Sequence, residues 1–310
     1  MNHGAPRRHR QEGAAPRANL NRRGNQMPSF TSNDALQGSA LLTPDVVATV
    51  IEKPVMEQSL AALLSQQMQT GSESVIVPTV TKDPTARWTA EGAEITTDDM
   101  EMKPLVIRPA KVAGLTVVTR ELADDSSADA ANLVGAGLTR DIIRQIDAAY
   151  FGALESPAPS GLAALDGTTE IKAGAAFSSL DPFIDAMQAA QSQGHPLTAY
   201  AANPADAAAL AKIKKATGSA ERLLTTERDA TGQLVRHIDG VPLMATPHVE
   251  QGTIWGVPST TSIFVRRTDT RVEVSDQTYF SSDRIAIRAI MRVGWGIINP
   301  AAIIKLTAAE

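Results

Sequence analysis

The chain has 310 residues, which suffices for one large domain or two smaller ones, and its 43% apolar and 20% charged content is ordinary for a globular protein. The lack of cysteine excludes disulfides, thiolate catalysis and cysteine-based zinc sites. No run of about 20 apolar residues could span a bilayer, and no apolar segment follows the N-terminal arginines as it would in a secretory signal. We therefore expect a protein that is made and kept in a cytoplasm and has no membrane partner.

Residues 1–38 are expected to form an arm with a charge opposite to that of the body. Residues 1–30 carry six arginines and one glutamate, a net charge of +5, and the other residues carry 23 basic and 33 acidic side chains, a net charge of −10. The six arginines are Arg7, Arg8, Arg10, Arg17, Arg22 and Arg23. An aperiodic polar segment of this kind does not fold alone. It could contact a neighbouring subunit, contact nucleic-acid phosphates loosely or remain a solvated tail. Met27 could also replace Met1 as the first residue that is translated.

Two helices are predicted within residues 39–71. Thr43-Pro44-Asp45 has the cap, proline and acid order of a helix start, and this helix is expected to end near Lys53. A second helix is predicted from Pro54 to Met68, with apolar residues recurring on one side and Gly71 after its end.

A long β-hairpin is predicted over residues 72–112. Two β-rich runs, 75–78 and 105–109, flank a long polar stretch. Prolines cannot donate hydrogen bonds within a sheet, and they occur at Pro78, Pro84, Pro104 and Pro109. Because a lone two-stranded hairpin is only marginally stable in water, we expect this one to lie on something else, such as another subunit.

The remaining chain alternates between helices and strands. The longest predicted elements are a helix from Ser126 or Ser127 to about Phe151 and a strand over residues 285–297, in which apolar residues recur with period 2. A strand is predicted at 113–119, helices at 181–193 and 203–215, a polar loop at 217–233, and further strands near 200–202, 234–245, 253–257 and 262–274. The pattern predicts an extended α+β body.

Catalytic and metal-binding motifs are not found in the sequence. None of the five histidines has a zinc-helix spacing, and His237 with Asp239 is interpreted as part of a turn. The Gly-x-Ser-x-Gly and Walker motifs are absent, and Gly135-Ala136-Gly137 lacks the third glycine of a dinucleotide fingerprint. We therefore expect that the protein is not an enzyme and binds no cofactor. A Ser-His-Asp triad whose members are scattered along the chain leaves no local signature, so a hydrolase stays a remote alternative.

Two charged groups are candidate contact surfaces. Arg284, Arg288 and Arg292 share one face of the long strand, where they could either pair with acids across an interface or form a solvated face. The acids of the hairpin tip are Glu91, Glu94, Asp98, Asp99 and Glu101. They are interpreted as an interaction surface in preference to a calcium site, because no spaced ligand set accompanies them.

Three segments together resemble a known family. They are residues 86–94 at the hairpin tip (ARWTAEGAE), residues 111–122 before the long helix (KVAGLTVVTREL), and residues 281–294 with 299–306 near the end of the chain. As a set they resemble the major capsid proteins of tailed bacteriophages, which have the Hong Kong 97 (HK97)-like fold. The resemblance covers about residues 40–306.

The resemblance implies an α+β capsid fold with an N-terminal arm, an extended β-hairpin loop, a peripheral domain with a long spine helix and a long strand, and an axial domain. The expected boundaries are 1–38 for the arm, 39–71 for the N-terminal helices, 72–112 for the extended loop, 113–181 and 276–310 for the peripheral domain, and 182–275 for the axial domain.

The resemblance also implies a function. Hexamers and pentamers of such a chain form the icosahedral head shell around double-stranded DNA, which is contacted non-specifically, in a virion assembled in the host bacterial cytoplasm. The expected partners are a separate scaffolding protein, a portal and decoration proteins. The expected contact residues are the six arm arginines, Arg87, Trp88, Glu91, Glu94, Arg284, Arg288 and Arg292. A covalent cross-link through Lys82, Lys103 or Asn299 is a remote option, and an encapsulin-type compartment shell, which would enclose an enzyme, is the runner-up.

Overall fold

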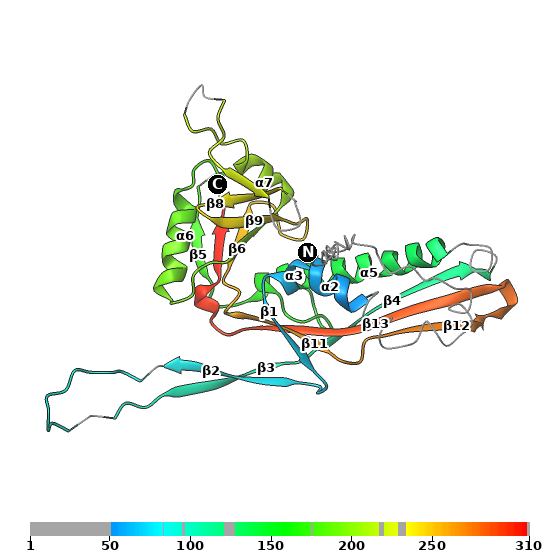
Figure 1. Cartoon of the computed structure of the whole chain (residues 1–310), viewed down its shortest axis with the longest axis horizontal. Coiled ribbons are helices and arrows are strands. Elements are labelled where there is room, and N and C mark those ends of the chain that lie inside the picture. Colours follow the sequence, from blue (N-terminus) through cyan, green and yellow to red (C-terminus); the bar gives the residue numbers. More distant parts are fainter. Residues whose placement is uncertain are drawn as a thin grey trace, which may run out of the picture.

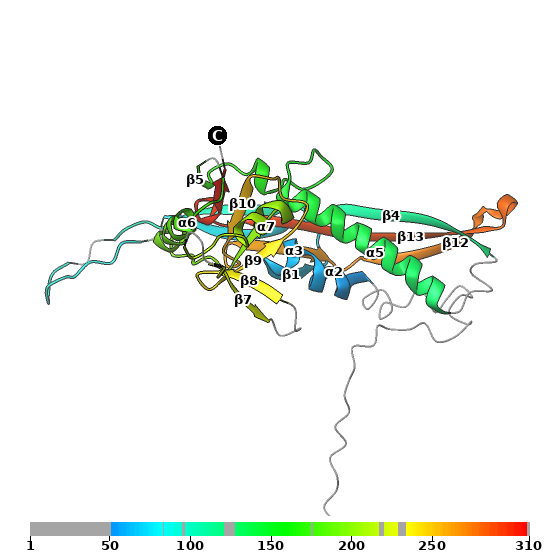
Figure 2. The ribbon, with the colours of Figure 1, turned by 90° about the horizontal axis from the view of Figure 1, so that it is seen from above.

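The computed structural model describes residues 51–82, 84–94, 97–120, 128–174, 176–216, 220–228 and 234–308. Figures 1 and 2 show an elongated molecule in which one lobe is built on a long sheet, a second lobe is more compact, and a hairpin extends outward from the body. The expected arm 1–38, its six arginines and the helix predicted from Thr43 lie outside the described residues.

The long lobe is an α/β layer built on a five-stranded sheet. Its strands are β1 (Gln66–Thr70), β4 (Ala110–Thr119), β11 (Ser262–Arg267), β12 (Arg271–Tyr279) and β13 (Arg284–Ile297). Strand β13 pairs with β4 over residues 284–293, and it also pairs with β11 and β12, which follow one another along β13. The helix α5 (Ala128–Phe151) runs along this sheet in both views (Figures 1 and 2). The predicted long strand and long helix are therefore confirmed.

The core of this lobe lies between α5 and one face of the sheet. Ala289, Met291 and Val293 of β13 are buried there together with Ile142 and Ile146 of α5. These strand residues alternate, so they share a face, and the helix residues are spaced by one turn. Burial of the two apolar stripes against each other is the main favourable contribution of this layer.

The compact lobe is a seven-stranded sheet with the helices α6 (Asp181–Ser192) and α7 (Pro204–Leu210). In sheet order its strands are β5 (Thr169–Lys172), β14 (Ile304–Thr307), β10 (Thr253–Val257), β6 (Ala199–Ala202), β9 (Val241–Ala245), β8 (Leu234–Ile238) and β7 (Thr225–Arg228). The Asn203 side chain caps α7 by accepting a hydrogen bond from the Ala205 N–H. The helix ends at Leu210, earlier than the predicted Lys215, and β7 occupies part of the region predicted as a loop.

Sheet membership divides the chain at points other than the expected domain boundaries. Strand β11 and the first part of β12 fall within 182–275, yet they belong to the sheet of β13. Strand β14 falls within 276–310, yet it pairs with β10 and β5 of the compact lobe. The reason is that these assignments depend on pairing between strands far apart in sequence, which short-range periodicity does not report.

The N-terminal segment, residues 51–70, corrects another prediction. In place of one helix from Pro54 to Met68 it contains the helices α2 (Lys53–Gln58) and α3 (Leu60–Leu63), followed by strand β1, which pairs in parallel with β11. Glutamine has a favourable helix propensity, and this segment contains Gln66, Gln67 and Gln69. Pairing with β11 therefore overrides the local preference for a helix. Met68, predicted to lie on an apolar stripe, is exposed.

Short 3-10 turns complete the described structure. They are η4 (Leu162–Ala164), η5 (Phe280–Ser282) and η6 (Pro300–Ala302). The turn η5 joins β12 to β13 at the end of the long lobe that lies opposite the hairpin (Figures 1 and 2).

Candidate assembly surfaces

The hairpin consists of β2 (Val75–Lys82) and β3 (Glu101–Ile107), which form a separate two-stranded sheet. One face of its base packs on the long lobe. Ile107 is buried with Ile263 and Val265 of β11, and Val75, Val77 and Leu105 pack against this cluster. Beyond its base the hairpin extends away from the body (Figure 1). The predicted hairpin is confirmed.

A glycine of the long strand makes this anchoring possible. A Cβ atom on Gly296 would lie 2.7 Å from both Cδ1 and Cγ1 of Ile107 and 3.0 Å from Leu105. Such separations are far shorter than ordinary carbon–carbon contacts. The hairpin base can therefore lie on β13 only because this position has no side chain.

The other face of the hairpin is an apolar ladder. Three cross-strand pairs share that face, because directly opposed residues of antiparallel strands point to the same side. They are Ile76 with Val106, Pro78 with Pro104, and Val80 with Met102. All six side chains are exposed, Ile76 to 65% and Met102 to 55%. We call these six residues the apolar ladder.

The hairpin tip contains four of the predicted contact residues. Arg87, Trp88, Glu91 and Glu94 are all exposed, and Trp88 is fully so. The turn around Gly92 has a positive φ of 83°, which favours glycine.

Local polar contacts shape the chain leading to the tip. Lys82 forms an ion pair with Asp98 at 3.2 Å, and the Thr85 N–H also donates to this carboxylate. The hydrogen bonds from Thr85 and Lys82 hold the pKa of Asp98 below its usual range. The acid cluster is therefore accompanied by at least one cation of its own.

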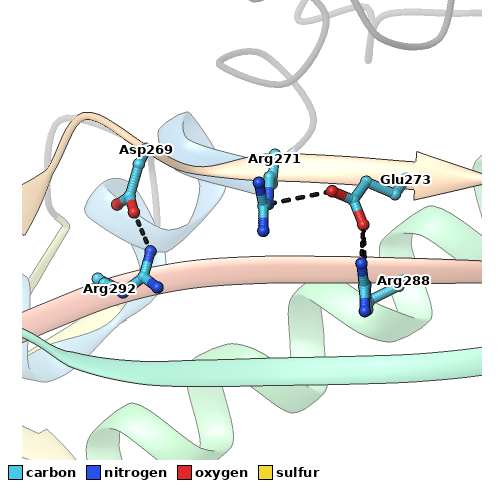
Figure 3. A network of polar contacts seen from close by, with 5 residues as sticks. All are labelled: Asp269, Arg271, Glu273, Arg288 and Arg292. Carbon is cyan, nitrogen blue, oxygen red and sulfur yellow. Dashed lines mark hydrogen bonds and ion pairs between the residues drawn. The ribbon is translucent and has the colours of Figure 1, made fainter.

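The arginines of β13 lie on the sheet face opposite α5, where the acids that pair with two of them come from the same chain. Arg288 Nε donates to Glu273 at 2.9 Å, and Arg292 pairs with Asp269 (Figure 3). Arg271 of β12 adds an ion pair with Glu273 at 3.1 Å. The hydrogen bond from Arg288 is the main cause of the lowered pKa of Glu273.

Arg288 and Arg292 are thus each paired with an acid of the same chain, and their predicted role in a contact between subunits stays a prediction. The acids lie on β12 and on the turn before it, at positions that come next to β13 only when β12 pairs with it. Arg284 is exposed at the beginning of β13.

On the sheet face opposite α5, strand β4 contributes exposed apolar residues beside the arginines of β13. Leu115 lies opposite Arg288 and is 62% exposed, and Ala113 lies opposite Ile290 and is also exposed. The intervening Gly114 faces α5, since a Cβ there would lie 2.9 Å from Leu138. We call this surface the open sheet face, and it comprises Lys111, Ala113, Leu115, Arg271, Glu273, Arg284, Arg288 and Arg292, with Asp269 at its edge.

A buried carboxylate fastens the N-terminal segment to α5. Asp147 accepts hydrogen bonds from the Ser59 hydroxyl at 2.7 Å, from the Ala61 N–H at 3.1 Å and from the Leu60 N–H at 3.2 Å. The carboxylate thereby satisfies the first N–H groups of α3. Burial raises the pKa of Asp147, and these hydrogen bonds and the charge of His248 oppose the shift in part.

The residues considered for a cross-link have local roles. Lys82 is paired with Asp98, Lys103 lies opposite Thr79 in the hairpin, and the Asn299 side chain caps η6 by accepting from the Ala301 N–H at 3.2 Å. Within the described ranges, no three His, Cys, Asp or Glu side chains gather in a way that could hold a metal ion.

The sequence model of the phage capsid family matches residues 38–308, which is most of the chain. The chain belongs to the phage capsid family. This membership confirms the resemblance inferred from the hairpin tip and the C-terminal segment. No curated protein sequence matches the chain.

Solved structures confirm the fold of this capsid-family chain. A chain of the structure described as the capsid of an empty GTA particle computed with C5 symmetry has a TM-score of 0.67 at 18% identity, covering 81% of this chain and 90% of that one. A chain from Microbacterium phage Oxtober96 has a TM-score of 0.64 at 16% identity, covering 80% and 90%. A chain from Mycobacterium phage Adephagia has a TM-score of 0.63 at 17% identity, covering 80% and 89%.

Because it belongs to this family, the chain is a capsid shell protein, and such proteins have a structural role. In the part of the chain that the structure describes, no helix combines the length and the apolar character needed to cross a membrane. Sequence reasoning did not single out the apolar ladder, Leu115 or Asp147. The hairpin residues could have been found from their alternation, had the register of β2 against β3 been known.

Proposed function

We propose that this capsid-family chain assembles, as hexamers and pentamers, into an icosahedral shell that encloses double-stranded phage DNA. The observation that carries the proposal is the hairpin, which packs on its own body at the base and presents an exposed apolar ladder beyond it. Exposed contiguous apolar surface on a soluble protein marks an interaction site. The C5 symmetry in the description of the GTA capsid supports five-fold rings of such chains.

Shell stability in this proposal comes from many modest contacts. A single interface of about 1,600 Å² is typical of stable complexes, and a subunit in a shell makes several interfaces at once, so their strengths reinforce one another. A separate scaffolding protein, a portal and decoration proteins are proposed partners. The basic segment 1–30 is proposed to contact a neighbouring subunit or DNA phosphates.

The test is negative-stain electron microscopy of the purified protein, with sizing by light scattering. Closed shells or capsomer rings are the expected result, and their diameter distinguishes a phage-sized head from a small compartment. The same measurements are repeated on the protein expressed together with the candidate scaffolding protein, in case assembly requires it. A protein that stays a monodisperse monomer over a range of salt and protein concentrations, with and without that scaffold, contradicts the proposal.

A further inference from the structure

A short β-bridge in the compact lobe, after α7, holds two cations side by side. Two backbone hydrogen bonds, of 3.2 and 2.9 Å, join residues 213–215 to residues 221–223 in an antiparallel arrangement. Lys214 and Arg222 are the bridged pair that lies between these bonds. In such a non-hydrogen-bonded pair the opposed Cα atoms are only about 4.5 Å apart, and the two side chains lie on the same face.

The base of this bridge is fixed in the compact lobe. Leu210 at the end of α7 and Leu224 directly before β7 are buried in its core, and Ile213 packs against the same core. Figure 1 shows the segment that follows α7 projecting from this lobe on the side away from the hairpin. The backbone beneath the two cations is therefore held in place, while the side chains of Lys214 and Arg222 are exposed.

The chain around the bridge leaves this pair of charges largely uncompensated. Residues 212–222 carry four basic side chains and one acidic one, a net charge of +3 in a chain whose overall charge is −5. The acid, Glu221, forms an ion pair with the lysine on its own bridge, Lys215, at 2.9 Å. Among the residues that the structure describes, Arg222 has no ion-pair partner, and Lys214 donates to a backbone carbonyl at 3.2 Å.

Two like charges directly opposite each other repel and destabilise the pairing of their strands. An anion bound between them converts this repulsion into attraction, because it contacts both cations at once. A phosphate group suits the position. Its oxygens accept two hydrogen bonds from a guanidinium and a third from an ammonium. A terminal phosphate also carries a charge of about −1.5 to −2, which neutralises both cations, whereas a carboxylate neutralises only one.

From this arrangement we propose that Lys214 and Arg222 form a binding site for a phosphate group, which comes either from a DNA backbone or from a soluble polyphosphate such as a nucleoside triphosphate. The inference goes beyond the proposed function, which assigns contacts with DNA phosphates to the basic segment 1–30 alone. The bound phosphate bridges the two cations and stabilises the β-bridge that presents them. Because the site is complete within one subunit, it does not require assembly.

The test compares the wild type with the double variant Lys214→Gln with Arg222→Gln. The matched control, Lys172→Gln with Arg140→Gln, also removes one lysine and one arginine from exposed positions. Lys172 lies on β5, at the edge of the seven-stranded sheet opposite β7, and Arg140 lies on α5. Every protein is the full chain, and light scattering verifies that all are compared in the same state of assembly.

Three probes are measured. A fluorescent DNA duplex is titrated by anisotropy at several salt concentrations, and sodium tripolyphosphate and polyglutamate are titrated by calorimetry. We expect the double variant to lose tripolyphosphate binding, and its slope of log K against log salt for DNA to be smaller by about 1–2, since each phosphate contact contributes about 0.9. The control is expected to match the wild type. A loss confined to DNA identifies the backbone as the source of the phosphate, and a loss confined to tripolyphosphate identifies a soluble ligand.

A double variant that matches the control with both phosphate probes overturns the site and leaves the shell function intact. Polyglutamate binding that depends on Lys214 and Arg222 as strongly as tripolyphosphate binding overturns the assignment to phosphate. The single variant Arg222→Gln repeats the titrations should a lowered melting temperature show that the double variant is misfolded. A wild type that never forms shells overturns the proposed function, and the outcome of these titrations is independent of it.

Discussion

Asp147 shows how one side chain can hold two parts of this fold together. It lies on α5, and its three hydrogen bonds go to Ser59, Leu60 and Ala61 at the beginning of α3. These donors are buried or partly buried, so removal of the acceptor would leave them without a partner. Although it is a carboxylate, Asp147 is buried, because the beginning of α3 packs against it and donates hydrogen bonds to it.

We expect Asp147→Ala to lower the free energy of unfolding by about 2–4 kcal/mol, since it leaves several buried donors unsatisfied. Urea denaturation of the unassembled subunit, followed by circular dichroism, measures this change. Asp141→Ala is the matched control on the same helix, because Asp141 is exposed and pairs with Arg144 at 3.2 Å. Equal losses in the two variants would show that Asp147 has no special role.

The raised pKa of Asp147 gives a pH dependence with a definite sign. A folded-state pKa above the unfolded one means that, between the two, the folded protein holds a proton that the unfolded chain has released. The part of the stability that depends on protonation of Asp147 is therefore fully present below about pH 4 and is lost as the pH rises through the raised folded-state pKa.

The comparison with Asp147→Asn, which does not titrate, isolates this effect. We expect the free energy of unfolding of the wild type, minus that of the variant, to fall as the pH rises from about 4 toward neutrality. Denaturant titrations at a series of pH values measure it. A His248→Gln background removes the nearby charge that acts on Asp147. A difference that grows with pH would contradict the assignment.

At the scale of elements, the close approach of β13 and the hairpin base determines how the hairpin is anchored. Gly296→Ala brings a methyl group within 2.7 Å of Ile107, which is buried and cannot move freely. We expect a loss of about 1–3 kcal/mol from overpacking, together with poorer shell assembly, because the hairpin base must shift.

Thermal unfolding and electron microscopy of the same preparations check this prediction. Gly71→Ala is the control, since the nearest atom to its new methyl group is Thr268 Oγ1 at 3.8 Å. Shortening of Ile107 in the double variant Gly296→Ala with Ile107→Ala is expected to restore assembly in part. Unchanged stability and assembly in Gly296→Ala would show that the hairpin base adjusts without cost.

At the scale of the whole molecule, folding and assembly use different parts of the chain. The described residues of the tip are exposed except for the half-buried Asp98, and the cores lie between α5 and the long sheet and within the compact lobe. Replacement of residues 83–100 by an Asn-Gly turn joins Lys82 to Glu101, which are already paired across the hairpin.

We expect this shortened chain to keep the melting temperature of the unassembled wild type and to form few or no closed shells. Differential scanning calorimetry and negative-stain microscopy measure the two properties separately. The matched variant Trp88→Ala removes only the exposed aromatic anchor and is expected to weaken assembly less. A large drop in melting temperature would show that the tip contributes to the fold of its own subunit.

The sequence by itself determined the elements whose patterns are local and long. The period-2 run of β13, the apolar stripe of α5 and the proline-flanked hairpin each depend on residues close in the chain. The joint occurrence of the hairpin tip and the C-terminal segment also determined the family, since those residues were sufficient to suggest it before the fold was known.

Only the tertiary structure decided which distant segments meet. It made residues 66–70 a strand beside β11, placed β14 in the compact lobe, and brought Glu273 to Arg288 and Ser59 to Asp147. The register of the hairpin likewise decided which of its residues share the exposed face. Such contacts join residues far apart in sequence, and their free energy depends on burial and pairing that no short window of the chain contains.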